Sequence, residues 1–309
     1  MKTKQPTETA ASGVTHYARM LIKTIDHASA ALKQQDPAEA LHTFRVNIRR
    51  LRTQLAAFSD VISLSRAVKR QLRRLAHCTN EARDVQVAVE ILSSLTTSPT
   101  AHVPQASLRL YRKEAARCID KLQAWLPREW APLRRRLLKQ LASCSDNDRA
   151  VAYRQASRRQ FETHLLALRQ FLATITAVQD LEGLHKARIL TKQLRYLLEP
   201  FADDDALATT IPELVQLQDQ LGSIRDLMLL RQRIKAEALK RQNTALSQRF
   251  EIRRNKTSLI SQPLDNDIAL YRYLHALAKR EFASLAKTVL GDNAKPFIAN
   301  LRHANRCLR

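Results

Sequence analysis

Residues 41–58, LHTFRVNIRRLRTQLAAF, have a close counterpart in residues 184–201, LHKARILTKQLRYLLEPF. The offset between the two copies is 143 positions. A second matching pair, CTNEARD at residues 78–84 and QLGSIRD at residues 220–226, follows at an offset of 142. This internal repeat predicts that each half of the chain contains a helix led by a histidine, a further helix and an Arg-Asp pair.

Each copy of the repeated stretch separates its charged and apolar residues when it is wound as an α-helix. At 3.6 residues per turn, the His and three basic residues of each copy fall within an arc of about 80°. The apolar residues fall on another face, which is predicted to pack into the core. The residues of the two basic arcs are His42, Arg45, Arg49 and Arg52 in the first half, and His185, Arg188, Lys192 and Arg195 in the second.

The basic arcs lack the acidic neighbours that a solvated helix face normally has. A charged stripe is most often a solvated face, but such faces mix signs so that pairs form one turn apart. Between His42 and Arg74 there are nine Lys or Arg residues and one acid, Asp60. Because both halves repeat these repelling charges at the same positions, the pattern predicts a bound anion. Cations that recur at each turn, about 5.4 Å apart, favour an anion with regularly spaced charges over a single phosphate.

Basic residues outside the repeated helix extend the candidate site in the first half. Lys69 and Arg73 share one helix face, one turn apart. The corresponding stretch of the second half, residues 211–216, contains no basic residue. The first half is therefore predicted to hold anions more tightly.

The Arg-Asp pairs, Arg83-Asp84 and Arg225-Asp226, come soon after an asparagine and a glycine. Asn and Gly tolerate the left-handed conformation that ends many helices. The pattern predicts a helix end followed by a new helix with its Asp in the first turn. Two interpretations stay open. The Asp stabilises the helix dipole while the Arg pairs with a neighbour, or the Arg and the helix N-terminus together bind phosphate.

The composition points to a polyanionic partner and excludes several classes of protein. In 309 residues there are 52 Lys+Arg and 29 Asp+Glu, a formal charge of +23, and 45% of the residues are hydrophobic, enough for a core. Only four glycines occur, far below the usual ~7%. This scarcity argues against an all-β fold. It also leaves no glycine-rich phosphate loop of the Rossmann or P-loop kind.

Apolar residues recur at helical spacing along almost the whole chain, so the fold class is predicted to be all-α. The polar run ASCSDNDR, residues 142–149, is the predicted linker between halves at 14–142 and 149–309, and residues 1–13 are predicted to be disordered. The predicted helices are 14–34, 37–60, 65–79, 83–95, 105–125, 128–142, 149–176, 181–200, 206–221, 225–242, 245–259, 264–289 and 294–307.

Cysteine spacing and the N-terminus indicate the compartment. Cys78, Cys118, Cys144 and Cys307 form no C-x-x-C pair and fit neither a zinc site nor the disulfide framework of a small secreted domain. They are predicted to be reduced core thiols. The N-terminus has no apolar signal segment, and no stretch approaches the ~18 apolar residues of a membrane span. We expect a cytoplasmic protein.

Three functions are compatible with these features: polyanion binding, nucleic-acid binding, and histidine-dependent phosphotransfer or phosphate hydrolysis. The net charge would attract nucleic acid, but aromatic residues are 5% of the chain, so base stacking is disfavoured and only weak, non-specific binding is expected. Hydrolysis would require a general base, and the basic arcs contain no carboxylate. No metal-ligand spacing such as H-x-x-H occurs near the two histidines, and no cofactor is predicted.

The motif His-x-x-Arg-x-x-x-Arg/Lys-x-x-Arg, at His42 and again at His185 and followed each time by an Arg-Asp pair, resembles the CHAD family, the conserved-histidine α-helical domain. The resemblance covers residues 14–308. It implies two four-helix-like bundles related by a pseudo-twofold axis, with a basic pore or groove between them. It also implies binding of inorganic polyphosphate, often at polyphosphate granules. The E-x-E-x-K signature of the CYTH triphosphatase domain, often fused to CHAD domains, is absent, and we expect no enzymatic activity.

The resemblance, together with the charge pattern, gives the predicted polyphosphate site. Two departures from the first copy, Lys192 in place of Arg49 and Gln193 in place of Arg50, weaken the second half as a bidentate phosphate clamp. The predicted site residues are His42, Arg45, Arg49, Arg50, Arg52, Lys69, Arg73, Arg83, His185, Arg188, Lys192, Arg195 and Arg225.

Overall fold

The computed structural model describes residues 8–34, 36–97, 103–143, 151–207, 209–251 and 261–308. Within these ranges every regular element is a helix, apart from an isolated bridge between Thr9 and Ala152, so the predicted all-α fold is confirmed. The elements are α1 (Ala10–Ala31), α2 (Pro37–Ala57), α3 (Arg66–Cys78), α4 (Asn80–Leu95), α5 (Gln105–Ala142), α6 (Tyr153–Thr174), α7 (Leu181–Leu198), η1 (Glu199–Phe201), α8 (Thr210–Glu251), α9 (Ser261–Val289), η2 (Gly291–Asn293) and α10 (Ala294–Cys307).

The two repeated helices, α2 and α7, begin with the same kind of cap. The Asp36 side chain accepts a hydrogen bond from the backbone N–H of Glu39 at 3.1 Å, and Pro37 occupies the first helical turn. The Asp180 side chain accepts from the backbone N–H of Gly183 at 2.9 Å. An aspartate cap satisfies a free backbone donor and favours the helix dipole. These caps set where each His-led helix starts.

The predicted apolar faces of α2 and α7 pack into the core. On α2 they include Phe44, Ile48 and Leu51, each 0% exposed. The aromatic residues that end the two repeats, Phe58 and Phe201, both pack against Tyr153, with ring centroids 5.5 and 5.0 Å away. A single cluster of buried apolar side chains extends from α1 to the end of α10. The two repeats therefore share one core.

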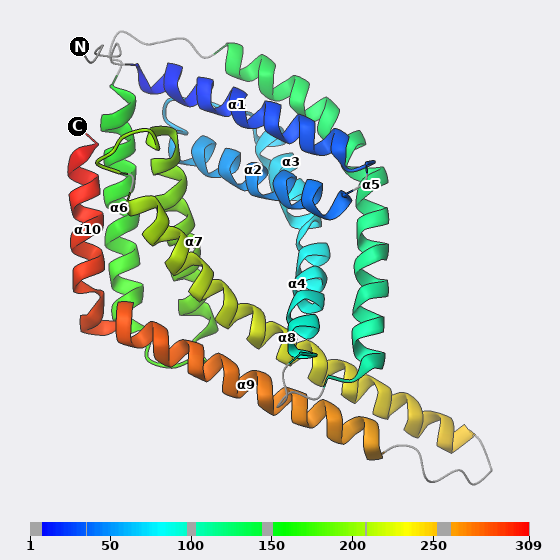
Figure 1. Ribbon diagram of the computed structural model, residues 1–309. Coiled ribbons are helices and arrows are strands. Elements are labelled where there is room, and N and C mark those ends of the chain that lie inside the picture. The colour runs from blue at the N-terminus through cyan, green and yellow to red at the C-terminus, as the bar shows by residue number, and fades with distance from the viewer. Residues whose placement is uncertain are drawn as a thin grey trace.

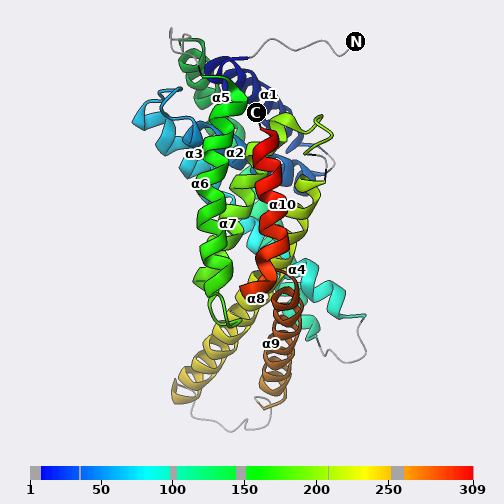
Figure 2. The same ribbon diagram turned by 90° about the vertical axis from the view of Figure 1, so that its left-hand side faces the viewer.

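The helices are arranged around four sides (Figure 1). α1 and α2 lie together on one side, α6 and α10 on the next, α8 and α9 on the third, and α4 with part of α5 on the fourth. α7 packs against α6 and α8, while α3 lies on the outside against α2 and α5 (Figure 2). The far ends of α8 and α9 project beyond the other helices. A pseudo-twofold axis between the halves stays a prediction.

Three of the predicted helix breaks are wrong. The break between 125 and 128 falls inside α5, which contains Pro127 and Pro132 and changes direction along its length (Figure 1). Proline removes a backbone donor and bends a helix without necessarily ending it. The three helices predicted over 206–259 are one continuous helix as far as Glu251; residues 252–259 lie outside the described residues.

The chain begins its helical structure earlier than expected. α1 starts at Ala10, where the prediction was disorder through residue 13, because Thr9 caps the helix by accepting from the backbone N–H of Ser12 at 3.2 Å. The rest of the predicted disordered N-terminus, residues 1–7, and most of the linker at 142–149 lie outside the described residues. No described helix combines the length and apolarity that a membrane span requires.

The prediction that the cysteines are core thiols is wrong for Cys78, which is exposed at the end of α3. Cys118 and Cys307 are partly buried, and all three are free thiols. Cys144 lies outside the described residues. Cys78 does not lie on the apolar face of α3. It is the last residue of this helix, and its side chain is exposed to solvent.

Glu199, directly after α7, joins three helices. Its carboxylate accepts a hydrogen bond from Nη2 of Arg50 on α2 at 2.8 Å, forms an ion pair with Nε of the same arginine at 2.8 Å, and lies 3.3 Å from Nε of Arg195. The Tyr17 hydroxyl of α1 donates to it at 3.5 Å. The Glu199 side chain is only 12% exposed. Through these contacts, Glu199 connects the repeated helix of the first half, α2, to that of the second half, α7.

Replacement of Glu199 by glutamine is expected to lower the free energy of unfolding by about 3 kcal/mol, because two partly buried arginines lose their counter-charge. The matched control is Glu90→Gln. Glu90 also pairs with an arginine, Arg83, at 2.9 Å, but its side chain is 53% exposed, so the expected loss is below about 1 kcal/mol. Urea denaturation measures both changes; equal losses would contradict the structural role of Glu199.

Candidate anion-binding site

The basic arcs of α2 and α7 face each other where these helices pack. Arg188 of α7 is among the charges that lower the pKa of Arg45 on α2. Arg49 of α2 is likewise among those that lower the pKa of Arg188 and of Lys192. The fold thus brings together two sets of cations that lie far apart in the sequence. We name the following residues the basic cluster: His42, Arg45, Arg49, His185, Arg188 and Lys192.

In the first half, Arg45 is held against α4. It is 8% exposed, and burial together with repulsion from Arg49 and Arg83 lowers its pKa to about 9. The side-chain oxygen of Asn80 accepts a hydrogen bond from Arg49 at 2.8 Å and another from Arg45 at 3.5 Å. The charge of Asp84 counteracts the lowered pKa of Arg45. One amide therefore fixes two guanidinium groups without neutralising them.

In the second half, Arg188 has an equivalent acidic neighbour. Burial lowers its pKa, and the charge of Asp226 counteracts this shift. Arg225 lies 3.4 Å from Asp226 and donates to it. Burial raises the pKa of Asp226, while Arg188 and Arg225 act to lower it. Asp226 and Asp84 thus stand beside equivalent arginines of the two repeats.

The two histidines also have equivalent neighbours. Partial desolvation lowers the pKa of His42, and Arg83 lowers it further; for His185, desolvation and Arg225 do the same. Both rings are therefore neutral near pH 7. A neutral histidine beside arginines can gain a proton when an anion approaches, and can then donate a charge-assisted hydrogen bond.

Lys192 has the most perturbed basic side chain of the cluster. Burial, followed by repulsion from Arg188 and Arg49, lowers its pKa to about 6. Its amine is therefore mostly neutral at pH 7 in the free protein. An arginine at the same position would stay charged, because guanidinium groups keep their proton far more strongly. The Lys-for-Arg difference between the repeats thus makes the second arc responsive to pH.

A helix end followed by a new helix does occur next to Asn80, where α3 ends at Cys78 and α4 begins at Asn80, but the left-handed conformation predicted there and the helix end predicted at Gly222 are wrong. No described residue other than glycine has a positive φ, and Gly222 lies inside α8. Asn80 is the first residue of α4, so Asp84 stands beyond the first turn. Because Asp226 and its neighbour Arg225 are also inside α8, there is no helix N-terminus beside them that could bind phosphate.

Asn80 and Gly222 instead contact arginines of the basic cluster. Asn80 supplies the acceptor described above for Arg45 and Arg49. At Gly222, a Cβ atom would lie 3.2 Å from Nε of Arg188, closer than the usual spacing of such contacts. The glycine therefore leaves room for the Arg188 guanidinium. The two repeats therefore have different residues at this position. Asn80 accepts hydrogen bonds from two arginines, whereas Gly222 leaves space for the side chain of one.

Arg50 and Arg195 differ from the other predicted site residues. Arg50 is held by both oxygens of Glu199, which raises the pKa of its guanidinium. It lies outside the basic cluster because it projects from another face of α2, and its part in anion binding stays a prediction. Arg195 is 9% exposed, pairs with Glu199 and stacks over Tyr196 at 4.8 Å. It borders the cluster through its repulsion of Lys192.

The remaining predicted residues surround the cluster. Arg83 and Arg225 stand next to the two histidines, and Arg83 also pairs with Glu90. Arg52 is close to both Arg49 of α2 and Arg73 of α3. Burial and the charges of these two arginines lower its pKa. The Nε of Arg73 donates to the backbone oxygen of Lys69 at 3.3 Å.

Sequence reasoning missed Asn80, Asp84 and Asp226 as neighbours of the cluster arginines, and Glu199 as a partner of Arg50. The two aspartates recur at the offset of the repeat, which was the available signal. Asn80 and Glu199 have no identical residue in the other half, so no pattern marked them. Among the residues that the structure describes, no group of three or more His, Cys, Asp or Glu side chains is placed to hold a metal ion.

Comparisons with known proteins agree with this architecture. In structure, the chain is similar to the CHAD domain from the plant Ricinus communis, with a TM-score of 0.67 and 21% identity over 97% of this chain and 93% of that one. No curated protein sequence gives a significant match. The sequence model of the CHAD domain matches residues 16–235, which contain both copies of the His-led helix and both Arg-Asp pairs. The chain belongs to the CHAD domain family.

Proposed function

We propose that this protein binds inorganic polyphosphate in the basic cluster, without catalysis, and that it does so at polyphosphate granules in the cell. Membership of the CHAD family is consistent with polyphosphate-related binding. The proposal rests chiefly on one observation. Buried or half-buried cations from two repeats lie close enough to lower one another's pKa, and few carboxylates stand among them.

A bound polyanion would remove this repulsion. Guanidinium groups form paired hydrogen bonds with phosphate oxygens, and such charge-assisted bonds are among the stronger ones in proteins. In the free protein, Arg45 and Arg49 share the single amide oxygen of Asn80, and Arg49, which is half-buried, is more accessible to a ligand than the buried Arg45. The arginines are therefore already oriented by the protein, which reduces the ordering needed on binding.

We propose binding without hydrolysis because, among the described residues, the carboxylates beside the cluster are neighbours of arginines. The carboxylates nearest the cluster, Asp84 and Asp226, lie beside Arg45, Arg188 and Arg225. We expect polyphosphate incubated with the protein to be recovered at its original length. Release of phosphate that disappears in His42→Gln or His185→Gln would instead place the protein among enzymes.

Binding is expected to take up a proton at Lys192. The pKa of its amine is about 6 in the free protein, and adjacent phosphates would raise it. Affinity for polyphosphate should therefore increase as the pH falls from about 9 toward 6. Calorimetry at pH 8, in two buffers of different ionisation enthalpy, measures the uptake directly. At this pH the phosphate groups of the ligand, whose last pKa is near 6, are already ionised.

Lys192→Arg is the matched control, because it keeps the charge but holds its proton throughout this pH range. Its proton uptake at pH 8 should be smaller than that of the unmodified protein, and the uptake that remains belongs to other groups such as His42 and His185. Lys192→Met should raise the free energy of unfolding at pH 7 by about 1 kcal/mol or more. The sign follows because the unfolded chain, with an ordinary lysine pKa, binds more protons than the folded one between pH 6 and 10. Uptake that is unchanged in Lys192→Arg would exclude Lys192 from the site.

A further inference from the structure

A second basic surface lies on the outside of the molecule, on α3. This helix contains five Lys or Arg residues and no acid. Its apolar residues Val68, Leu72 and Leu75 are buried on one side. At 100° per residue, the basic residues fall on the opposite side, within about 140°. They are Arg66, Lys69, Arg70, Arg73 and Arg74.

The second half of α5 runs alongside α3 in the opposite direction. Gln140 of α5 bonds Ser65 at the start of α3, through its side-chain oxygen to the backbone N–H and through its nitrogen to the hydroxyl, both at 3.0 Å. At the other end, Arg74 stacks over Trp125 at 5.5 Å. The exposed Arg136 stands one turn before Gln140 on this side of α5. It therefore adds a cation beside those of α3.

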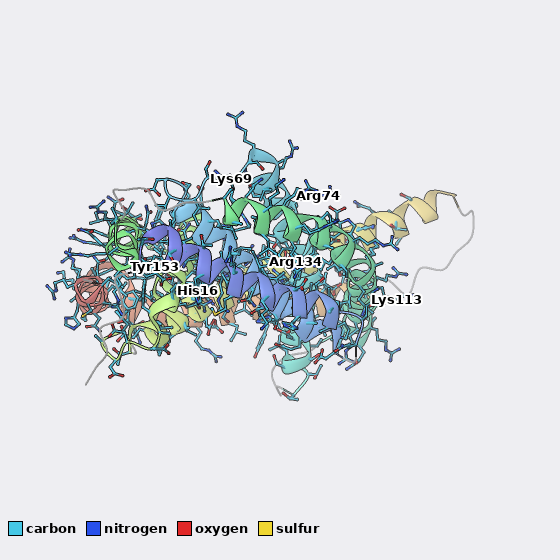
Figure 3. All side chains as sticks on the ribbon, turned by 90° about the horizontal axis from the view of Figure 1, so that it is seen from above. His16, Lys69, Arg74, Lys113, Arg134 and Tyr153 are labelled. Carbon is cyan, nitrogen blue, oxygen red and sulfur yellow. The ribbon has the colours of Figure 1, made fainter. Side chains whose placement is uncertain are left out.

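Little acidic charge opposes this surface. The nearest ion pair, between Arg74 and Glu129, is 4.0 Å long, and Arg74 is 60% exposed. Arg134 of α5 is different, because it turns toward α1 and lies 3.4 Å from Asp26. Figure 3 shows Lys69 and Arg74 along one edge of the molecule, with Arg134 further inward. We name Arg66, Arg70, Arg74 and Arg136 the outer basic surface.

The outer basic surface is continuous with the basic cluster. Arg52 connects them, because Arg49 of the cluster and Arg73 of α3 both lower its pKa. From Arg73, the basic face of α3 leads around to Arg70 and Arg74, next to α5. Cations therefore follow one another from the contact of α2 and α7 to the exposed side of the fold.

Resting on the function proposed above, we infer that the outer basic surface binds the part of a long polyphosphate chain that extends out of the basic cluster. Short chains occupy the cluster alone, and longer ones continue past Arg52 and Arg73 onto α3 and α5. A thin, flexible polyanion fits this route because it can bend from a partly buried site onto a surface. A single-stranded nucleic acid is less suited, since Trp125 on this side is partly buried beneath Arg74 and is not free to stack on bases.

The test compares two triple variants of the full-length protein with equal loss of charge. The first, Arg66→Gln, Arg70→Gln and Arg136→Gln, changes exposed residues of the outer basic surface. The control, Arg272→Gln, Arg280→Gln and Arg302→Gln, changes exposed residues of α9 and α10. Affinity is measured for tripolyphosphate, for a chain of about 100 phosphates and for single-stranded RNA, over a range of salt concentrations.

We expect the first variant to lose about tenfold or more in affinity for the long chain and less than twofold for tripolyphosphate. Its slope of log affinity against log salt for the long chain should fall by about 2, since each lost contact with a single-stranded polyanion contributes about 0.7. The control should lose less than threefold.

Other outcomes separate the inference from the proposed function. If both triple variants lose equal affinity for the long chain while tripolyphosphate still binds, the outer basic surface is only part of a diffuse field and the inference is wrong. If the first variant loses affinity for single-stranded RNA but not for polyphosphate, the surface serves nucleic acid and the inference is again wrong. If the unmodified protein binds neither polyphosphate, the proposed function itself fails.

Discussion

Arg49→Gln is expected to weaken polyphosphate binding by about tenfold or more. A hydrogen bond between charged groups contributes about 1.5–3 kcal/mol, and a tenfold change in affinity corresponds to about 1.4 kcal/mol. Arg49 is close enough to Arg45, Arg188 and Lys192 to act with all three. The double variant with Arg188→Gln should lose about 100-fold. Titration of a labelled polyphosphate at fixed salt measures both.

Arg302→Gln is the control for Arg49→Gln, because it removes the same charge from the exposed face of α10. Its expected loss of affinity is less than about twofold. The folded state of Arg49→Gln should be at least as stable as that of the unmodified protein, since the substitution relieves repulsion between neighbouring cations. Equal losses of affinity at positions 49 and 302 would mean that the ligand is held by net charge alone.

Affinity is expected to increase steeply with the number of phosphates until the chain reaches both arcs, and more gradually for longer chains that continue onto the outer basic surface. A chain bound to the arc of α2 makes its contact with α7 intramolecularly, which raises the effective concentration of the second contact. Orthophosphate and pyrophosphate are too short to benefit. Avidity of this kind can exceed the affinity of either arc by about 100-fold or more. A titration series of defined chain lengths measures this dependence.

We expect the steep part of this length dependence to come from the arc on α7. Neutralising that arc therefore separates its contribution to the affinity from that of the arc on α2. In the triple variant Arg188→Gln, Lys192→Gln and Arg195→Gln, affinity should rise less with length, while short chains still bind the first half through Arg45 and Arg49. The Arg195 substitution also removes a partner of Glu199, so the free energy of unfolding must be measured beside the affinity. A full length dependence in a folded triple variant would show that the arcs do not form one site.

Much of the fold was predictable because the repeated helix has a regular pattern. The apolar positions around Phe44 and Ile48 recur at helical spacing, and they are buried where the pattern placed them. The caps at Asp36 and Asp180 also follow from local sequence. The continuity of α5 and α8 did not follow. Proline at 127 and glycine at 222 usually mark helix ends, but tertiary packing can override such local preferences.

The site was predictable where it depends on helix faces and unpredictable where it depends on distant partners. The angular positions of Arg45, Arg49 and Arg188 placed them on the basic arcs. That Arg50 would be held by Glu199 could not be inferred, since 149 positions separate them and only the packing of α2 against the end of α7 joins them. The space that Gly222 leaves for Arg188 is likewise a tertiary feature.

Competition at physiological salt tests the central proposal most directly. A labelled polyphosphate bound to the protein is displaced by unlabelled polyphosphate, single-stranded RNA or duplex DNA, with concentrations matched by total phosphate. Electrostatic attraction alone would favour duplex DNA over a single-stranded polyanion, because its charges lie only about 1.7 Å apart along the axis, whereas the two facing arcs favour a thin, flexible chain. We predict displacement by polyphosphate at concentrations at least tenfold lower than by RNA or DNA. Equal displacement by RNA would contradict the proposal that the basic cluster is a polyphosphate site.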